Sequence, residues 1–300
     1  MTLNLANVWT LAADREAAHQ GAPHIDLEHL YLGLLQVGGD AARLLGERGI
    51  SLTLARTHVA AQRGHSFGPH HHGAQVLPLT RRAQDLTAEA LKRATGTSAL
   101  LLHLLEHPSG TVNALVEAGG VRPATLIPAL DLGAVDPFVP VDVPLDTSSL
   151  PTPARAHSLT WYVSRPPAHV VDGLNQPASL AWWAYDPATA TTEGDGTVVR
   201  HHRRGQDVTV RLHRSDHQQG EARVVVWEAD MVDGPRAGEP LSHDSFEVGP
   251  APGGSQVTRT AGLRSFGLLG RVLAPLTNRV TARTLMMAAA TITFGVNQQE

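Results

Sequence analysis

The chain has 300 residues, a length that predicts about two domains. Its formal net charge of −4 argues against a dedicated nucleic-acid-binding protein, because such proteins carry an excess of basic residues. The lack of cysteine excludes a disulfide scaffold, thiolate-ligated zinc and a cysteine nucleophile. The first residues lack the basic and apolar regions of a signal peptide, and arginines interrupt the longest apolar stretch, residues 266–296. We therefore expect a cytoplasmic protein with no membrane span and no nucleic-acid partner.

Composition changes twice along the chain and predicts a multidomain protein with three parts. Residues 1–135 alternate apolar helical runs with short glycine-bearing turns, which indicates an all-α domain. Residues 136–154 are rich in proline, which fixes φ and removes backbone donors, so we expect an extended, semi-rigid linker. Residues 155–300 carry short β-branched runs between Gly, Asp and Pro turns, with one helical segment near Pro166–Leu180 and a long helix at the end. This order predicts an α+β domain.

The helical part contains an internal repeat. Gly33-Leu34-Leu35 corresponds to His103-Leu104-Leu105, and Leu44-Leu45 corresponds to Ala114-Leu115 at the same offset. Apolar residues recur at i, i+3, i+4 and i+7 in both copies, so each helix should turn one face to a shared core. Asp26 stands where a helix N-cap is expected. We predict an all-α double-repeat helical bundle.

The first copy resembles the repeat at the N-terminus of Clp-type unfoldases. The matching residues are Ala13, Ala17, Ile25, Glu28-His29-Leu30, Leu32-Gly33-Leu34-Leu35, Ala42, Leu44-Leu45 and Gly49-Ile50. Thr80, Arg82 and Ala83 are similar to the start of the family's second repeat, but Ser98-Ala99 stand where Glu28-His29 stand in the first copy. The resemblance implies a non-catalytic domain that docks substrates and adaptors, and whose repeat glutamates receive phosphoarginine in some members.

Three residues form the binding site that this resemblance implies. Glu28, His29 and Arg82 are the expected contacts for a peptide or a phosphoarginine, because a carboxylate at a helix start can pair with a guanidino group. The alternative is that Glu28 and His29 cap a helix and anchor the repeat core. Since only the first copy keeps the glutamate, we expect one weak site per chain. A Walker A loop is missing from the sequence, so the chain cannot itself power unfolding.

The second domain resembles the START/Bet v1-like (SRPBCC, polyketide cyclase-type) superfamily. The resemblance lies in the strand pattern, in the segment Gly253–Thr260, and in the run Gly267–Leu276 that follows. It implies a helix-grip fold, in which an antiparallel sheet curls around a long C-terminal helix and encloses an apolar cavity. The residues that we expect to line this cavity are Trp161, Tyr162, Trp182, Trp183, Trp227, Phe246, Leu285, Met286 and Phe294. The alternative for each of them is a place in the ordinary core.

Two histidine-bearing segments suggest a metal site and a catalytic triad, but neither segment supports that interpretation. His65, His70, His71 and His72 lie in a Gly- and Pro-bearing segment where consecutive histidines cannot easily converge on one metal, so we predict no metal and no cofactor. Ser242-His243-Asp244 contains the letters of a catalytic triad, but triads are assembled across a fold and not along three neighbours.

Two functions fit these observations. The first is a non-catalytic binding protein, acting as a Clp protease adaptor, sensor or decoy, whose partners are a Clp unfoldase, an adaptor or a tagged protein. Its second domain would bind a hydrophobic or cyclic-peptide small molecule. The alternative is a polyketide cyclase/dehydratase-type enzyme with an N-terminal localisation module, which would need His, Asp or Arg side chains that converge inside the cavity. A stress-associated scaffold that uses both domains for protein contacts is a third option.

Overall fold

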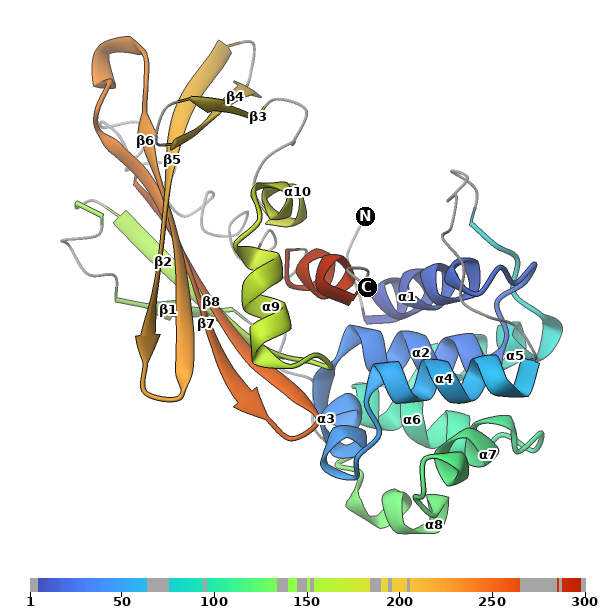
Figure 1. The fold of residues 1–300 in the computed structure, drawn as a ribbon. Coiled ribbons are helices and arrows are strands. Elements are labelled where there is room, and N and C mark those ends of the chain that lie inside the picture. Colours follow the sequence, from blue (N-terminus) through green and yellow to red (C-terminus); the bar gives the residue numbers. More distant parts are fainter. Residues whose placement is uncertain are drawn as a thin grey trace. The chain divides into compact units, whose positions relative to one another are not determined.

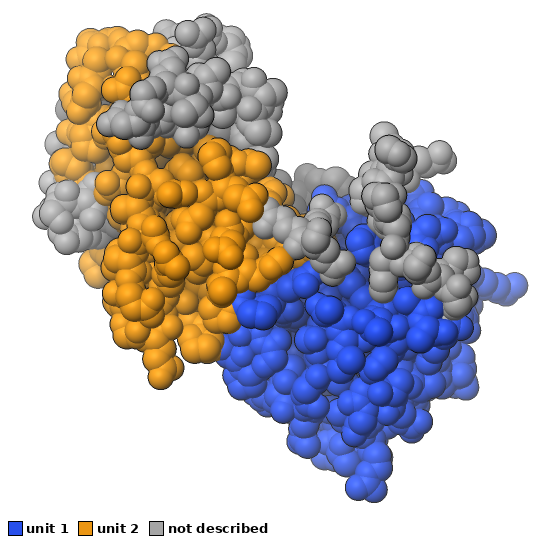
Figure 2. Space-filling view, in the orientation of Figure 1, with its two compact units in different colours: residues 1–137, 162–166, 251–255 blue, residues 138–161, 167–250, 256–300 orange. Residues whose placement is uncertain are grey.

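The structure is a computed structural model of the chain. It describes residues 5–63, 76–93, 96–133, 140–144, 150–151, 154–183, 190–193, 196–203, 206–264, 285 and 288–297. The chain divides into two compact units, which Figure 2 shows in different colours. Unit 1 comprises Met1–Pro137, Tyr162–Pro166 and Ala251–Ser255, and unit 2 comprises Phe138–Trp161, Pro167–Pro250 and Gln256–Glu300.

The first and longest segment of unit 1 folds mainly into helices (Figure 1). They are α1 Leu5–His19, α2 Leu27–Val37, α3 Gly39–Glu47, α4 Leu52–Arg63, α5 Arg81–Arg93, α6 Thr97–Leu105, α7 Thr111–Ala118 and the short α8 Pro123–Leu126, which a 3₁₀ turn at Ile127–Ala129 follows. All residues of α2 are buried, so this helix forms the centre of the unit. Helices were predicted for this region, whereas the all-α double-repeat bundle and its membership of the Clp repeat family stay predictions.

Helix α1 lies very close to α2 because Gly33 has no side chain. A Cβ on Gly33 would lie 2.6 Å from the backbone nitrogen of Ala13. The indole Nε1 of Trp9 donates a hydrogen bond to the carbonyl oxygen of Leu30 at 2.7 Å, which fixes the same pair of helices. The glycine of the LGLL string is therefore a packing requirement.

A buried ion pair connects α1 to α4. The Nε and Nη2 of Arg56 donate to Oε2 and Oε1 of Glu16 at 2.9 and 2.7 Å, and both side chains are almost fully buried. Each carboxylate oxygen thus receives its own N–H, which is the strong bidentate geometry of a guanidinium with a carboxylate.

The two short segments that unit 1 takes from later in the chain also make specific contacts within it. The Ser164 hydroxyl donates to the carbonyl oxygen of Leu35 at 3.1 Å, and Arg165 Nη1 donates to Oγ1 of Thr53 at 3.0 Å. The Tyr162 hydroxyl donates to the carbonyl oxygen of Pro252 at 3.0 Å. Burial raises the pKa of Tyr162 to about 12.

Unit 2 is an α+β structure around one antiparallel sheet, and its content of strands and helices is compatible with a helix-grip domain. In the described part of the chain the sheet has eight strands in the order β1-β2-β8-β7-β6-β5-β4-β3. Their bounds are β1 Val141–Val143, β2 Ala154–Val163, β3 Ala190–Glu193, β4 Gly196–Arg203, β5 Gln206–Gln219, β6 Ala222–Met231, β7 Pro240–Ala251 and β8 Gly254–Arg264. Strands β3 to β7 pair consecutively and antiparallel, while β8 lies between β7 and β2.

Helices accompany this sheet at two points of the chain (Figure 1). Helix α9 (Pro167–Leu174), a 3₁₀ turn at Pro177–Ser179 and α10 (Leu180–Trp183) follow β2, close to the predicted helical segment at Pro166–Leu180. Residues 288–297 are also helical. The Nε1 of Trp161 on β2 donates to Oγ1 of Thr293 at 3.1 Å, so this last helix is attached to the sheet. The run Gly267–Leu276 lies outside the described residues.

The predicted linker, residues 136–154, contributes a strand of its own. Val141–Val143 form β1 and pair antiparallel with β2, in the register Val141 to Ser158 and Val143 to Ala156. Pro140 and Pro144 flank this strand and donate no backbone hydrogen bond, which explains its length of three residues. His157 Nδ1 lies 2.7 Å from Oδ1 of Asp142 and adds a polar contact between β1 and β2.

Candidate functional site

The register of β6 and β7 places three side chains of the candidate site on one face of the sheet. Val225 pairs with Phe246, and Trp227 pairs with Asp244. Because directly opposed residues point to the same side and alternate residues share a face, Trp227, Asp244 and Phe246 all lie on that face. The Nε1 of Trp227 donates to the carbonyl oxygen of Leu174 at 3.3 Å. Helix α9 therefore covers this side of the sheet.

Trp183, Trp227 and Phe246 form what we call the aromatic cluster. Trp183, at the end of α10, lies with its ring centre 5.2 Å from that of Phe246 in an edge-to-face arrangement, and 6.1 Å from that of Trp227. These separations are those of attractive aromatic pairs. All three side chains are buried. The sequence prediction thus named three residues that the structure brings together.

A buried ion pair lies against the aromatic cluster. Arg259 on β8 donates from Nε and Nη2 to the same oxygen, Oδ1 of Asp244, at 3.0 and 2.6 Å. The guanidinium carbon of Arg259 lies 5.2 Å from the ring centre of Trp183 and 5.5 Å from that of Phe246. A cation at this distance is attracted by the negative face of an aromatic ring. Arg259 is only 5% exposed, so the site holds a charge that water hardly reaches.

The other predicted cavity residues are not part of the aromatic cluster. Trp161 contacts Thr293 as described above, and Leu285 is buried. Trp182 is partly exposed, and a Cβ on Gly295 would overlap its ring. Phe294 is buried in the last helix, Tyr162 belongs to unit 1, and Met286 lies outside the described residues. Whether these residues line a cavity or form the core stays a prediction.

Arg259 and Asp244 are the residues that sequence reasoning missed. The sequence draws attention to Asp244 only as part of Ser242-His243-Asp244. In the structure Asp244 lies within β7 and shares a face with Phe246 and Val248. The strand pattern carried a usable signal, because a charged residue at a position that alternates with buried apolar residues points into the interior. Arg259 alternates in the same way with Val257 and Ala261, which are both buried.

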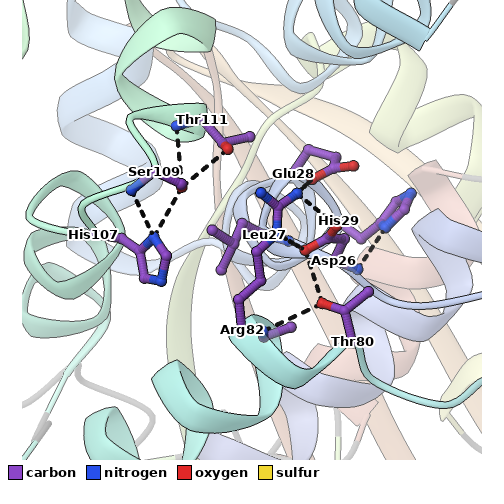
Figure 3. A network of polar contacts seen from close by, with 10 residues as sticks. Asp26, Leu27, Glu28, His29, Thr80, Arg82, His107, Ser109 and Thr111 are labelled. Atoms are coloured by element: carbon purple, nitrogen blue, oxygen red, sulfur yellow. Dashed lines mark hydrogen bonds and ion pairs between the residues drawn. The ribbon is translucent and has the colours of Figure 1, made fainter.

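In unit 1 the structure brings Glu28, His29 and Arg82 into one network around Asp26 (Figure 3). Asp26 is the N-cap of α2, as predicted: its Oδ1 accepts from the backbone N–H of Leu27 at 2.9 Å, while His29 Nδ1 accepts from the backbone N–H of Asp26 at 2.9 Å. The Asp26 side chain also accepts from the backbone N–H of His29, so the two residues form a capping box in which His29 takes the position that Glu or Gln usually holds. His29 therefore has a structural role at the helix start.

The guanidinium of Arg82, on α5, is held by two carboxylates. Its Nε and Nη2 each donate to one oxygen of Asp26 at 2.6 Å, and its Nη2 lies 3.9 Å from Oε2 of Glu28. The Thr80 hydroxyl also donates to Oδ1 of Asp26 at 2.9 Å. Glu28 is only 9% exposed, whereas Arg82 is 42% exposed. The binding role that the sequence predicts for these residues stays a prediction.

The pKa of Asp26 reflects this network. Burial alone would raise it, but the hydrogen bonds from Arg82, the Leu27 backbone N–H and Thr80, with the charge of the guanidinium, lower the pKa of Asp26 to about 2. Asp26 is therefore ionised throughout the physiological range, and it holds Arg82 as a charged partner.

The described residues contain no group of three or more His, Asp or Glu side chains placed to hold a metal ion. None of the helices that the structure describes is both long and apolar enough to cross a membrane. The predicted histidine-rich segment with His65 and His70–His72 lies outside this part of the chain.

Comparison with known proteins gives likeness in structure only. A scan against protein-family models produced no match, and a search of the curated proteins found none similar in sequence. Among solved structures, a STAR-related lipid transfer protein (fragment 25–204) from Xanthomonas axonopodis is 13% identical, with a TM-score of 0.36, over 53% of this chain and 99% of that one. The Mll3558 protein from Rhizobium loti is 18% identical, with a TM-score of 0.32, over 46% and 96%. TM-scores this low establish no common fold, so the α+β assignment above rests on the observed strands and helices.

Proposed function

We propose that unit 2 binds an apolar small molecule against the aromatic cluster. The observation that carries this proposal is the gathering of Trp183, Trp227 and Phe246 on the sheet face that α9 covers. Aromatic side chains supply large apolar contact area, and a buried polar group among them can fix the orientation of a ligand. The Arg259–Asp244 pair is such a group.

A titration with the neutral dye N-phenyl-1-naphthylamine tests this proposal, since its fluorescence rises in an apolar environment. We expect saturable binding by the full chain, and an affinity about tenfold lower in the variant Trp227→Leu, which removes part of the aromatic surface. Val232→Ser, at an exposed position outside the cluster, is the matched control and should bind as the wild type does. Failure of the folded wild-type chain to bind any apolar probe would contradict the proposal.

The cyclase/dehydratase alternative would also use this face. Arg259 and Asp244 are charged side chains that converge there, as that alternative requires. The neutralisation of each charge by the other supports ligand positioning over proton transfer. We therefore propose binding as the function of unit 2, and turnover of an aromatic polyketide mimic by the purified chain would favour the enzyme instead.

For unit 1 we propose a Clp N-like role in which Asp26 and Glu28 receive a guanidino group of a protein segment or a phosphoarginine-type tag. What supports this proposal is that the two carboxylates already hold the guanidinium of Arg82. In this account the chain acts as an adaptor, sensor or decoy for a Clp protease system, and a cyclic peptide would be an alternative ligand.

Calorimetric titration of the full chain with phosphoarginine, with an arginine-bearing peptide and with a cyclic peptide tests the role of unit 1. We expect one weak site per chain. Arg82→Ala should raise the affinity for the arginine-bearing peptide several-fold, because it removes the internal competitor, and Glu28→Gln should lower it. Absence of binding to all three compounds, with helicity unchanged, would rule out this role.

A further inference from the structure

Two buried hydrogen-bond donors at the aromatic cluster have no acceptor among the described residues. Among the residues that the structure describes, no atom accepts from Nη1 of Arg259 or from Nε1 of Trp183. Both residues are more than nine-tenths buried, at 5% and 7% exposure. An unsatisfied buried donor is costly, and a charged one more so, so each such group in a folded protein points to a missing partner.

The two donors belong to side chains in direct contact. The guanidinium carbon of Arg259 lies 5.2 Å from the ring centre of Trp183, and the ring of Phe246 lies beside both. By contrast, Nε1 of Trp227 in the same cluster donates to Leu174, and Nε1 of Trp161 donates to Thr293. The indole N–H groups of Trp227 and Trp161 are thus satisfied, whereas that of Trp183 is not.

The charge of the site favours an uncharged acceptor. Asp244 already neutralises Arg259 through two hydrogen bonds to Oδ1, and the two aromatic faces stabilise the cation further. A second carboxylate would place net negative charge in a buried, aromatic environment, which is unfavourable. A carbonyl oxygen has two lone pairs and no charge, so it can accept from both donors.

We propose that the ligand of unit 2 is an apolar carbonyl compound, such as an aromatic ketone or ester, whose oxygen accepts hydrogen bonds from Arg259 Nη1 and Trp183 Nε1. This inference rests on the proposed function of unit 2 and names the chemical class of its ligand. The aromatic cluster holds the apolar body of the molecule, and the two donors set its orientation.

Three probes of nearly equal shape test the inference by displacement of N-phenyl-1-naphthylamine from the full chain. They are 2-acetylnaphthalene, which has the carbonyl, 2-ethylnaphthalene, which has no oxygen, and 2-naphthoate, which carries a charge. We expect 2-acetylnaphthalene to displace the dye at a concentration about tenfold lower than 2-ethylnaphthalene, as a hydrogen bond to a charged group implies. We expect 2-naphthoate to displace it less well than 2-acetylnaphthalene.

Two variants test whether the preference for 2-acetylnaphthalene depends on Trp183 and on the Arg259–Asp244 pair. Trp183→Phe keeps an aromatic ring and removes the N–H, and it should reduce the preference for 2-acetylnaphthalene about threefold. Arg259→Met combined with Asp244→Leu removes the pair together, so that no unpaired charge stays buried, and it should abolish the preference while 2-ethylnaphthalene still binds. Circular dichroism confirms that each variant is folded.

The outcomes separate this inference from the function on which it rests. Equal displacement by 2-acetylnaphthalene and 2-ethylnaphthalene would overturn the carbonyl assignment and leave apolar binding intact. A preference for 2-naphthoate would also overturn it, since the site would then be an anion site. Failure of the dye and of all three probes to bind would overturn the proposed function itself.

Discussion

Each of the two units buries an arginine–carboxylate pair, and the two pairs differ in how many carboxylate oxygens accept from the guanidinium. In unit 1, Arg56 donates to both oxygens of Glu16, one N–H to each. In unit 2, Arg259 donates twice to a single oxygen of Asp244, and its Nη1 finds no acceptor among the described residues. The first pair is bidentate and connects two helices of unit 1. The second leaves Arg259 Nη1 unpaired within the described part of the chain, beside two aromatic rings, as the proposed ligand site requires.

The largest effect should come from breaking the closed pair. Arg56→Met leaves the carboxylate of Glu16 buried, and we expect it to lower the free energy of unfolding of unit 1 by about 3–5 kcal/mol. Replacing both residues, as Glu16→Leu with Arg56→Met, should restore most of this loss because no unpaired charge is left behind. Urea unfolding followed by far-UV circular dichroism measures both effects. A cost below about 1 kcal/mol for Arg56→Met would show that this pair is not structural.

Two glycine-to-alanine changes compare the packing of the two units. Gly33→Ala meets the backbone of α1 at Ala13 Cα and N, which cannot move alone, so we expect a cost of about 2 kcal/mol. Gly295→Ala meets the ring of Trp182, a partly exposed side chain that can turn away. We expect that change to stay within about 1 kcal/mol, also because alanine favours the helix. Equal costs, measured by thermal unfolding, would contradict the difference in packing.

The pH dependence of unit 1 should follow Asp26. Its pKa in the folded chain is about 2, below the ordinary 3.8, so the stabilisation is fully present above about pH 4 and is lost as the pH falls toward 2. We expect the wild type to lose about 1–2 kcal/mol of unfolding free energy through this group over that range, after allowance for solvent screening.

Urea unfolding at about pH 5 and at about pH 2.5 measures this loss. The difference between the wild type and Asp26→Asn should shrink at the lower pH. Asp85→Asn, at an exposed carboxylate of α5, is the control and should give a difference that does not change with pH. A constant difference for Asp26→Asn would show that the Arg82 network does not stabilise the folded chain.

The smallest effect on stability should come from Trp183→Phe. The indole N–H of Trp183 has no acceptor among the described residues, whereas that of Trp227 donates to Leu174. We therefore expect Trp183→Phe to cost less than about 1 kcal/mol, and Trp227→Phe to cost about 1 kcal/mol more because it removes a buried hydrogen bond to the carbonyl oxygen of Leu174. Chemical unfolding of both variants gives the comparison, and the reverse order would mean that Trp183 is held by a hydrogen bond in the folded chain.

The sequence predicts the order of elements well but not the polar interior. Alternation of β-branched residues indicated most strands, and the aromatic residues of the cluster stood out because the chain has so few of them. The edge strand Val141–Val143 was not expected, since prolines on both sides favour a linker and only pairing with β2 makes it a strand. Pairing of this kind depends on residues distant in the sequence, which local patterns do not contain.

For the candidate site, the sequence predicted the aromatic residues but not the ion pair. Trp183, Trp227 and Phe246 could be named as apolar lining without knowing the register. Arg259 and Asp244 could not be paired, because they lie on adjacent strands and meet only when β7 and β8 are side by side. In unit 1, Asp26 was identified as a cap, but its contact with Arg82 depends on how α5 lies against the start of α2.

The carbonyl stretching frequency of bound 2-acetylnaphthalene most directly tests whether Arg259 Nη1 and Trp183 Nε1 donate hydrogen bonds to a ligand. A carbonyl that accepts hydrogen bonds from a guanidinium and an indole absorbs at a lower frequency than one in an apolar solvent. We predict a shift to lower frequency in the wild type, a smaller shift in Trp183→Phe, and none in the double variant Arg259→Met with Asp244→Leu. A bound carbonyl that absorbs as it does in an apolar solvent would contradict the account.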